Sequence, residues 1–189
     1  EAYAAKLRKD HAVSSAPPRA VPVWSALDRI PEWLEAARQV CRDPPPEASK
    51  AAEWLIDNEY HVLRAVRQVR NDMPPAFYRR LSPVVSPDAD CAPRIFLAAR
   101  AYFDITHAQP EMQSAIDFMN AYQGEDGLAL AELWAFPAML RLVSLEGIAM
   151  AFCNLVPELP KPFGASQRSE PTPDRDSTDV LSRAIVALA

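Results

Sequence analysis

The residues best suited to chemistry lie along residues 47–71, where charged side chains follow one another at helical spacing. Glu53, Asp57 and His61 recur every four positions, so they share one face of a helix. Two carboxylates in such a row could act as general acid and general base on a bound sugar. A row of this kind is far more often a solvated, salt-bridged face, and we assign it no catalytic role.

Two polar residues of the same stretch face a different way. Asn58 and Glu59 turn toward the apolar side of the helix, where an unpaired polar group would cost roughly 1–3 kcal/mol. Both residues therefore need partners. The sequence indicates polar residues of the apolar stretch 128–156 as those partners.

That apolar stretch contains the remaining candidate site residues. Glu132 and Glu146 align with its apolar positions, whereas Arg141 faces another way beside Trp134. A buried polar network is the first interpretation, because buried charges need partners. The second is a ligand site in which Trp134 stacks on a sugar face while Glu132 or Arg141 binds hydroxyl groups.

The usual local motifs of catalysis and cofactor binding do not occur in the sequence. It has no glycine-rich phosphate loop, no GxSxG and no HExxH. The three cysteines, Cys41, Cys91 and Cys153, form no CxxC pair, and the three histidines are not placed with a nucleophile or a second ligand. We expect no catalytic residues, no cofactor and no metal in this segment.

Charge and hydropathy exclude other functions. The formal net charge of −5 disfavours binding to nucleic acid or to an anionic membrane surface. No run approaches the roughly twenty apolar residues that cross a bilayer, and the start of the chain lacks the pattern of a signal peptide. The segment is expected to be soluble and not membrane-spanning.

The elements that position these residues are predicted to be helices. Only four glycines occur, and Ala, Leu, Glu and Arg dominate the periodic stretches. We predict an all-α bundle of about seven to eight helices around a central apolar helix, 128–156, kinked near Pro137. The other predicted helices are 2–13, two short ones within 24–42, 47–71, 76–81, 94–107, 111–123 and 174–189.

Proline-rich stretches divide the chain into four parts. We predict an N-terminal arm at 1–22, a helical domain at 23–157 and a Pro/Ser-rich linker at 158–176. The last part, 177–189, is a terminal helix that packs back on the domain or begins a further segment. The chain ends inside an uncapped helical pattern, as expected of a piece of a longer protein.

Several motifs in a fixed order carry a family resemblance. They are AEWLIDN at 52–58, RNDMP at 70–74, FYRRL at 77–81, PRIF at 93–96, AYQ at 121–123 and ELWAFPAMLRL at 132–142, followed by Glu146. This succession resembles the N-terminal region of cyclic β-1,2-glucan synthases. The resemblance covers roughly residues 47–152.

The resemblance implies a role in making an osmoregulated periplasmic glucan in bacteria. In that family such a segment precedes a membrane-embedded glycosyltransferase that uses UDP-glucose, and a phosphorylase-like part lies near the far end. Neither part is present here, and no catalytic residue is carried over. The parent protein is expected in the bacterial inner membrane, with this part on the cytoplasmic side.

Three functions follow from these observations. The first is an accessory domain of a glucan synthase that supports synthesis or positions the glucan, with β-1,2-glucan or other domains of the parent as partners. The second is a helical protein-interaction or scaffold module. The third is a small α-helical glycosidase that uses Glu53, Asp57 or Glu132 with a second carboxylate.

Overall fold

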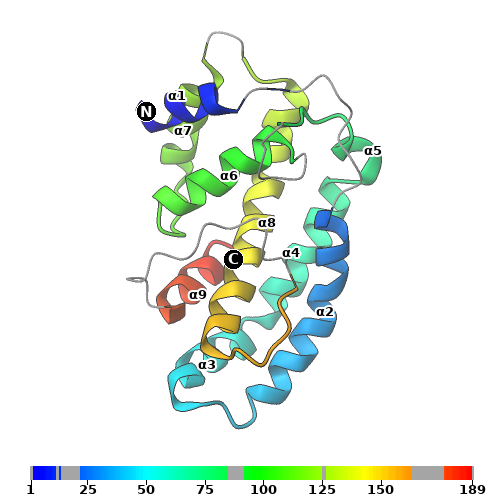
Figure 1. Ribbon diagram of the computed structural model, residues 1–189, viewed down its shortest axis with the longest axis vertical. Helices are drawn as coiled ribbons and strands as arrows, with labels where there is room; N and C mark the ends of the chain where they lie inside the picture. The colour runs from blue at the N-terminus through cyan, green and yellow to red at the C-terminus, as the bar shows by residue number, and fades with distance from the viewer. Residues whose placement is uncertain are drawn as a thin grey trace.

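The protein is described by a computed structural model that covers residues 2–11, 13, 22–84, 92–124, 127–162 and 177–188 (Figure 1). Within these residues it has nine α-helices, one 3₁₀ helix and no strand; two isolated β-bridges join Val13 to Val84 and Pro83 to Pro93. The predicted all-α class is confirmed. The helices are α1 (Ala2–Asp10), α2 (Pro22–Val40), η1 (Pro46–Ala48), α3 (Ser49–Asp57), α4 (Glu59–Asp72), α5 (Pro75–Tyr78), α6 (Arg94–Ile105), α7 (Met112–Gln123), α8 (Leu130–Leu155) and α9 (Ser177–Val186).

Helix α8 is the centre of the molecule. It runs along the middle of Figure 1, with α4 packed on one side and α6 and α9 on the other. Its residues are apolar on every face, and nearly all positions from Leu142 to Cys153 are buried. The predicted central apolar helix is confirmed. The helix continues through Pro137 without a break, and the kink stays a prediction.

The expectation that no stretch reaches membrane-spanning length was wrong for α8. With 26 residues, this helix is long and apolar enough to cross a membrane by length and composition alone. However, 78% of its most apolar window is buried inside the fold. The core helix of a folded protein meets the same test, and burial assigns α8 that role here.

Helix α2 is one helix where the sequence predicted two short ones. Pro31 lies inside it and has no amide proton to donate to the carbonyl of Leu27. Arg70 of α4 supplies the missing donor, because its Nη2 lies 3.4 Å from Leu27 O and 2.5 Å from Asp28 Oδ1. The side chain of Arg70 thus donates to the carbonyl of Leu27, which lacks its helical donor because residue 31 is proline.

The predicted single helix 47–71 is divided into α3 and α4. Asn58 separates them with φ −115° and ψ 12°, outside helical geometry. Its Nδ2 donates a 2.9 Å hydrogen bond to Trp54 O and so competes with the backbone for a helical acceptor. The break changes the chain direction and separates the charged residues of α3 from those of α4.

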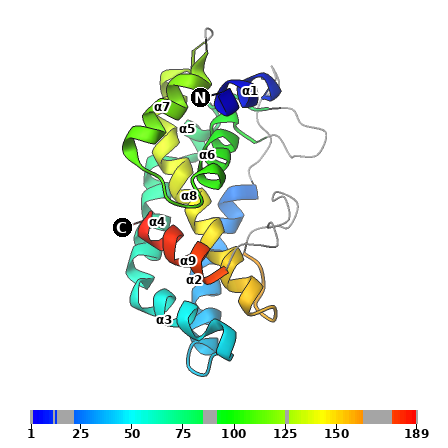
Figure 2. The same ribbon diagram turned by 90° about the vertical axis from the view of Figure 1, so that its left-hand side faces the viewer.

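The C-terminal helix α9 packs back on the domain. It lies against α8 and α3, as Figure 2 shows from the side. Gly147 of α8 faces both neighbours: a Cβ there would lie only 3.0 Å from the ring of Phe103 of α6, whereas its 3.8 Å distance to Ala184 of α9 is an ordinary packing contact. Leu181, Ala184 and Ile185 are buried in the contact. Residues 163–176, most of the predicted linker, lie outside the described residues.

Candidate functional site

The most buried polar group of the described chain is an ion pair between α6 and α8. Arg94 donates from Nε to Glu132 Oε1 at 2.6 Å and from Nη2 to Oε2 at 2.5 Å. The side chains of Arg94 and Glu132 are 7% and 0% exposed. The backbone amide of Ala129 also donates to Glu132 Oε2 at 2.9 Å and caps the start of α8. The pair is bidentate, and bidentate Arg–carboxylate pairs are among the strongest ionic hydrogen bonds in proteins.

The surroundings of Glu132 keep its carboxyl group ionised. Burial by itself would raise its pKa, but hydrogen bonds from Arg94 and from the Ala129 amide, together with the charge of Arg94, outweigh burial. A hydrogen bond with Ser82 adds to them, and the pKa lies below its ordinary value. The carboxylate is therefore charged at neutral pH and held by a fixed cation. It is not a proton donor in this state.

Glu146 forms a second ion pair between the same two helices. Arg100 Nη2 lies 2.7 Å from Glu146 Oε2, and both side chains are largely buried. The guanidinium group of Arg100 also lies over the ring of Phe96, 4.4 Å from its centroid. Glu132 and Glu146 are thus both satisfied by arginines of α6.

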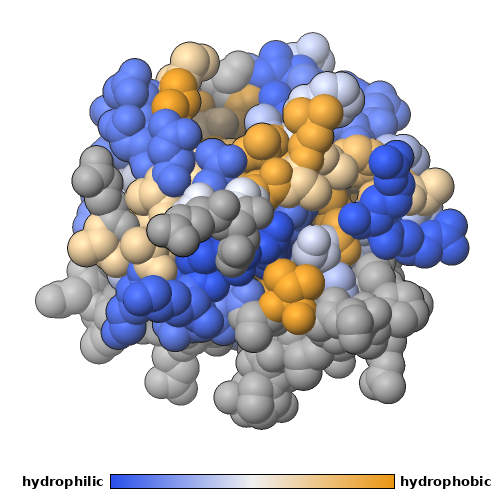
Figure 3. Space-filling model, turned by 90° about the horizontal axis from the view of Figure 1, so that it is seen from above, coloured by the Kyte–Doolittle hydropathy of each residue, from blue (hydrophilic) through white to orange (hydrophobic). Residues whose placement is uncertain are grey.

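Trp134 and Arg141 lie on the opposite, solvent-facing side of α8. Trp134 is 71% exposed, and the neighbouring Leu130, one turn before it, is also exposed. Arg141 Nη1 lies 3.6 Å from Asp72 Oδ2 of α4. We call Leu130, Trp134 and Arg141 the Trp134 face. Figure 3 looks down on the end of the molecule where α8 begins, and there apolar side chains lie among charged ones.

Asn58 and Glu59 find partners other than the central helix. The side chain of Asn58 bonds to its own helix turn, as described above, and Glu59 is paired with Arg38 of α2, whose Nε lies 2.9 Å from Glu59 Oε2. Arg38 also bonds to Glu35 Oε2 at 2.7 Å. These groups are partly exposed. The structure therefore does not assemble the six candidate residues into one site.

Sequence reasoning missed the arginines that pair with the three candidate glutamates. They are Arg38, Arg94 and Arg100. Arg94 and Arg100 lie in a helix with Ile95, Phe96 and Phe103, so the charges fall beside buried positions. That pattern was the available signal, since an arginine beside core residues needs an acidic partner. The identity of the partner requires the fold, because Arg94 and Glu132 are 38 residues apart.

A buried histidine at the end of α1 forms a hydrogen bond with a tyrosine of α7. His11 Nδ1 lies 2.6 Å from the hydroxyl of Tyr122, and the two rings meet edge to face at 5.8 Å. Burial lowers the pKa of His11; Asp10 opposes this shift, whereas Arg8 and Arg94 add to it. Burial also raises the pKa of Tyr122 to about 12. The contact is therefore made by a neutral imidazole and a neutral phenol.

The contact predicts a pH dependence of stability. An unfolded histidine titrates near pH 6.5, and the folded pKa of His11 is lower, so below about pH 6.5 the unfolded chain binds a proton that the folded chain does not. Stability is fully present above that pH and falls as pH decreases, by at most about 1.4 kcal/mol per pH unit for one group. We expect His11→Leu to flatten the slope between pH 7 and 5.5, measured by urea unfolding. An unchanged slope would contradict the prediction.

The cysteines and acidic residues form no metal site in the described ranges. No group of three or more His, Cys, Asp or Glu side chains there could hold a metal ion. Cys41 and Cys153 are free thiols, and Cys91 lies outside the described residues. Burial raises the pKa of the Cys153 thiol, which is the property of an unreactive core cysteine.

Fold and polar contacts together define the class of protein: an all-α bundle whose core helix is fixed by two buried Arg–Glu pairs. No family model matches the chain. The chain is 36% identical over 119 residues to the cyclic beta-(1,2)-glucan synthase NdvB of Rhizobium meliloti (strain 1021). The match covers 62% of this chain and 4% of that relative. The resemblance predicted from the motifs is confirmed, and this chain spans a small piece of the relative's length.

Proposed function

We propose that this chain is an accessory segment of a cyclic β-1,2-glucan synthase-like protein, which supports glucan synthesis or positions the glucan without a complete active site of its own. The choice of β-1,2-glucan as the ligand rests on the similarity to a cyclic beta-(1,2)-glucan synthase. The observation that carries the proposal is the exposed Trp134, because an indole left in solvent on a rigid helix is a ready platform for a sugar ring.

The surroundings of Trp134 suit such a platform. Two residues before it, Glu132 is fixed by Arg94, so the start of α8 is held in one orientation. Arg141, two turns farther along, presents a guanidinium group that can donate to hydroxyl groups. Sites on rigid elements keep their geometry better than sites on loops. The Trp134 face therefore combines an apolar surface with a polar group at its edge.

The proposed role is non-catalytic, and the burial of Glu132 supports this part of the proposal. A glycosidase acid must reach the glycosidic oxygen, whereas Glu132 is fully buried and bound to Arg94. The proposal places sugar transfer from UDP-glucose in other parts of a parent protein at the bacterial inner membrane, with this segment on the cytoplasmic side. The third candidate function, a small glycosidase, is less well supported, because Glu132 is not accessible to a substrate.

Calorimetric titration with linear β-1,2-glucan oligosaccharides tests the proposal. We expect binding by the intact chain and roughly 2- to 13-fold weaker binding by Trp134→Ala, because aromatic contacts of this kind contribute about 0.5–1.5 kcal/mol. Tyr60→Ala is the matched control, since Tyr60 is an equally exposed aromatic residue on α4. Unchanged helical circular dichroism would show that both variants fold. Absence of binding by the intact chain would refute glucan positioning.

One observation favours the second candidate function, a scaffold module. Leu130 and Trp134 are both exposed and adjacent on α8, so the Trp134 face also suits a protein partner, such as another domain of the parent. The terminal helix does not support this alternative. An exposed apolar surface on α9 would have favoured it, but Leu181 and Ile185 are buried against the core. Trp134→Ala would then weaken association with that partner and leave glucan titrations unchanged.

A further inference from the structure

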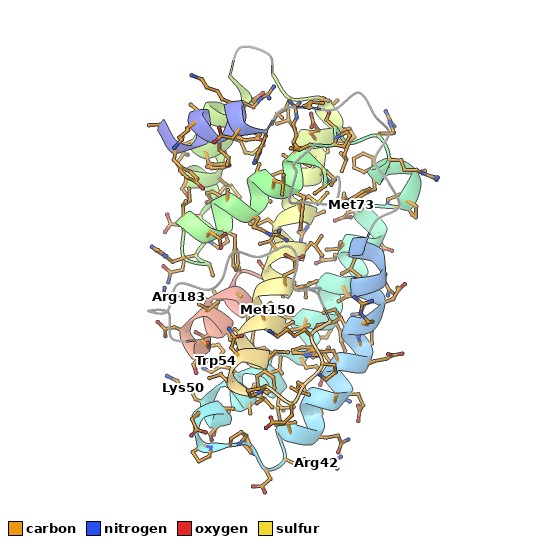
Figure 4. All side chains as sticks on the ribbon, in the orientation of Figure 1. Arg42, Lys50, Trp54, Met73, Met150 and Arg183 are labelled. Carbon is orange, nitrogen blue, oxygen red and sulfur yellow. The ribbon has the colours of Figure 1, made fainter. Side chains whose placement is uncertain are left out.

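A small cavity lies on another side of the molecule, where three segments meet. Helix α3, the connection between α6 and α7, and helix α9 line a solvent-accessible pocket of about 260 Å³. Figure 4 shows the side chains of Trp54 from α3 and Arg183 from α9 at this meeting point. The lining includes Trp54 of α3, Gln109, Pro110 and Glu111 of the connection, and Ser182, Arg183 and Val186 of α9.

The walls of the cavity combine an apolar surface with a few polar groups. The indole of Trp54, the ring of Pro110 and the side chain of Val186 give the apolar part. The amide of Gln109 can donate and accept hydrogen bonds, whereas the hydroxyl of Ser182 already donates to Asp179 O at 3.0 Å and can accept. This combination fits a ligand that has one apolar face and a rim of hydroxyl groups.

The charges at the cavity favour a neutral ligand. Arg183 is the cationic lining residue, and its Nη2 lies 3.0 Å from Asp179 Oδ2 on the preceding turn of α9. Glu111 adds a carboxylate to the lining. A phosphate or carboxylate ligand would meet these acidic groups together with an arginine that is already paired. The guanidinium group of Arg183 keeps further donors for hydroxyl groups.

The connection between α6 and α7 is held in a fixed shape. The hydroxyl of Tyr102 donates to Glu111 O at 2.9 Å and accepts from Glu111 N at 3.1 Å. His107 and Ala108 adopt left-handed φ values of 53° and 62°, which cost a non-glycine residue free energy. The amide of Ala108 bonds to Phe103 O at 2.9 Å. One wall of the cavity is thus formed before any ligand binds.

We propose that this cavity binds one neutral pyranose unit, either a free hexose or the terminal unit of an oligosaccharide. The ring stacks on Trp54, and its hydroxyl groups bond to Gln109, Ser182 and Arg183. The volume is at the small end for ligand sites and suits one ring rather than a chain. The cavity shares no residue with the Trp134 face, and the proposal does not depend on the function proposed above.

Ligand-observed and protein-observed NMR on the whole chain test the proposal. The probes are glucose, methyl β-glucoside and the β-1,2-linked glucose disaccharide. We expect millimolar binding of each and a shift of the Trp54 indole N–H signal on titration. Similar affinity for all three probes would indicate recognition of a single ring. Tighter binding of the disaccharide would assign the cavity to the terminal unit of an oligosaccharide.

Three variants separate this cavity from other sites. Trp54→Ala and Gln109→Ala are each expected to weaken binding at least tenfold, and the exposed Gln109 supplies a variant that leaves the core intact. Ile56→Ala, on the exposed side of α3, and Tyr60→Ala, on the exposed side of α4, are expected to leave it unchanged. Lack of binding by the intact chain, unaltered affinity in Gln109→Ala, or tighter binding of glucose 6-phosphate than of glucose would overturn the proposal.

Discussion

Replacing Arg94 by methionine is expected to lower the free energy of unfolding by about 3–5 kcal/mol. The substitution keeps an unbranched apolar stem but removes the guanidinium group, and it leaves the fully buried Glu132 without its cation. It also removes two hydrogen bonds, at 2.6 and 2.5 Å. Urea unfolding followed by far-UV circular dichroism measures the change, because most of the described chain is helical.

Two further variants show whether burial causes this effect. Arg38→Met removes an arginine that also binds a glutamate, Glu59, but on the surface, and it is expected to lower the free energy of unfolding far less than Arg94→Met does. The double variant Arg94→Met/Glu132→Met replaces the pair with apolar side chains and is expected to recover part of the loss, because the Ala129 amide then lacks its acceptor. Equal effects of Arg94→Met and Arg38→Met would contradict the role assigned to burial.

Truncating Leu181 to alanine is expected to destabilise the protein by about 2–5 kcal/mol. Leu181 is 0% exposed and lies in the contact of α9 with α8, so its loss leaves a cavity in the core. Val186→Ala on the same helix is the matched control. Its side chain is 63% exposed, and the change is expected to stay within about 0.5 kcal/mol. Thermal and urea unfolding measure both variants.

The outcome for Leu181 bears on the extent of the domain. A large loss in a single cooperative transition would show that α9 folds together with α8, although the chain between them includes residues 163–176. A loss below about 0.5 kcal/mol, or a separate early transition, would contradict the packing of α9 on the core. Such a result would favour the interpretation of 177–189 as the beginning of a further segment.

The sequence predicted the positions of most helices but not how helices are joined or broken. Apolar periodicity located α6, α7 and α8 to within a few residues, since it reports directly which face is buried. It failed at Pro31, where the helix continues through the proline and Arg70, distant in the chain, bonds to Leu27 O. It failed again at Asn58, where α3 ends and both the side-chain amide and the backbone amide bond to Trp54 O.

The candidate site was predictable only in part, for a similar physical reason. Glu132 and Glu146 stand out as charges on an apolar helix, and that local pattern correctly indicated that each needs a partner. The partners Arg94 and Arg100 come from another helix and are fixed by tertiary packing. The cavity beside Trp54 could not be predicted at all, because its walls come from three separate parts of the chain.

The two ion pairs between α6 and α8 also determine which misfolded arrangements are excluded. Glu132 and Glu146 lie about four turns apart on α8, whereas Arg94 and Arg100 lie less than two turns apart on α6. Both pairs form together only where the helices bring Arg94 close to Glu132 and Arg100 close to Glu146 at the same time. A slip of α6 by a single turn would leave four charges buried without counterions, at several kcal/mol for each ion. The two pairs therefore favour one register of α6 on α8. Apolar packing alone specifies the register less strictly.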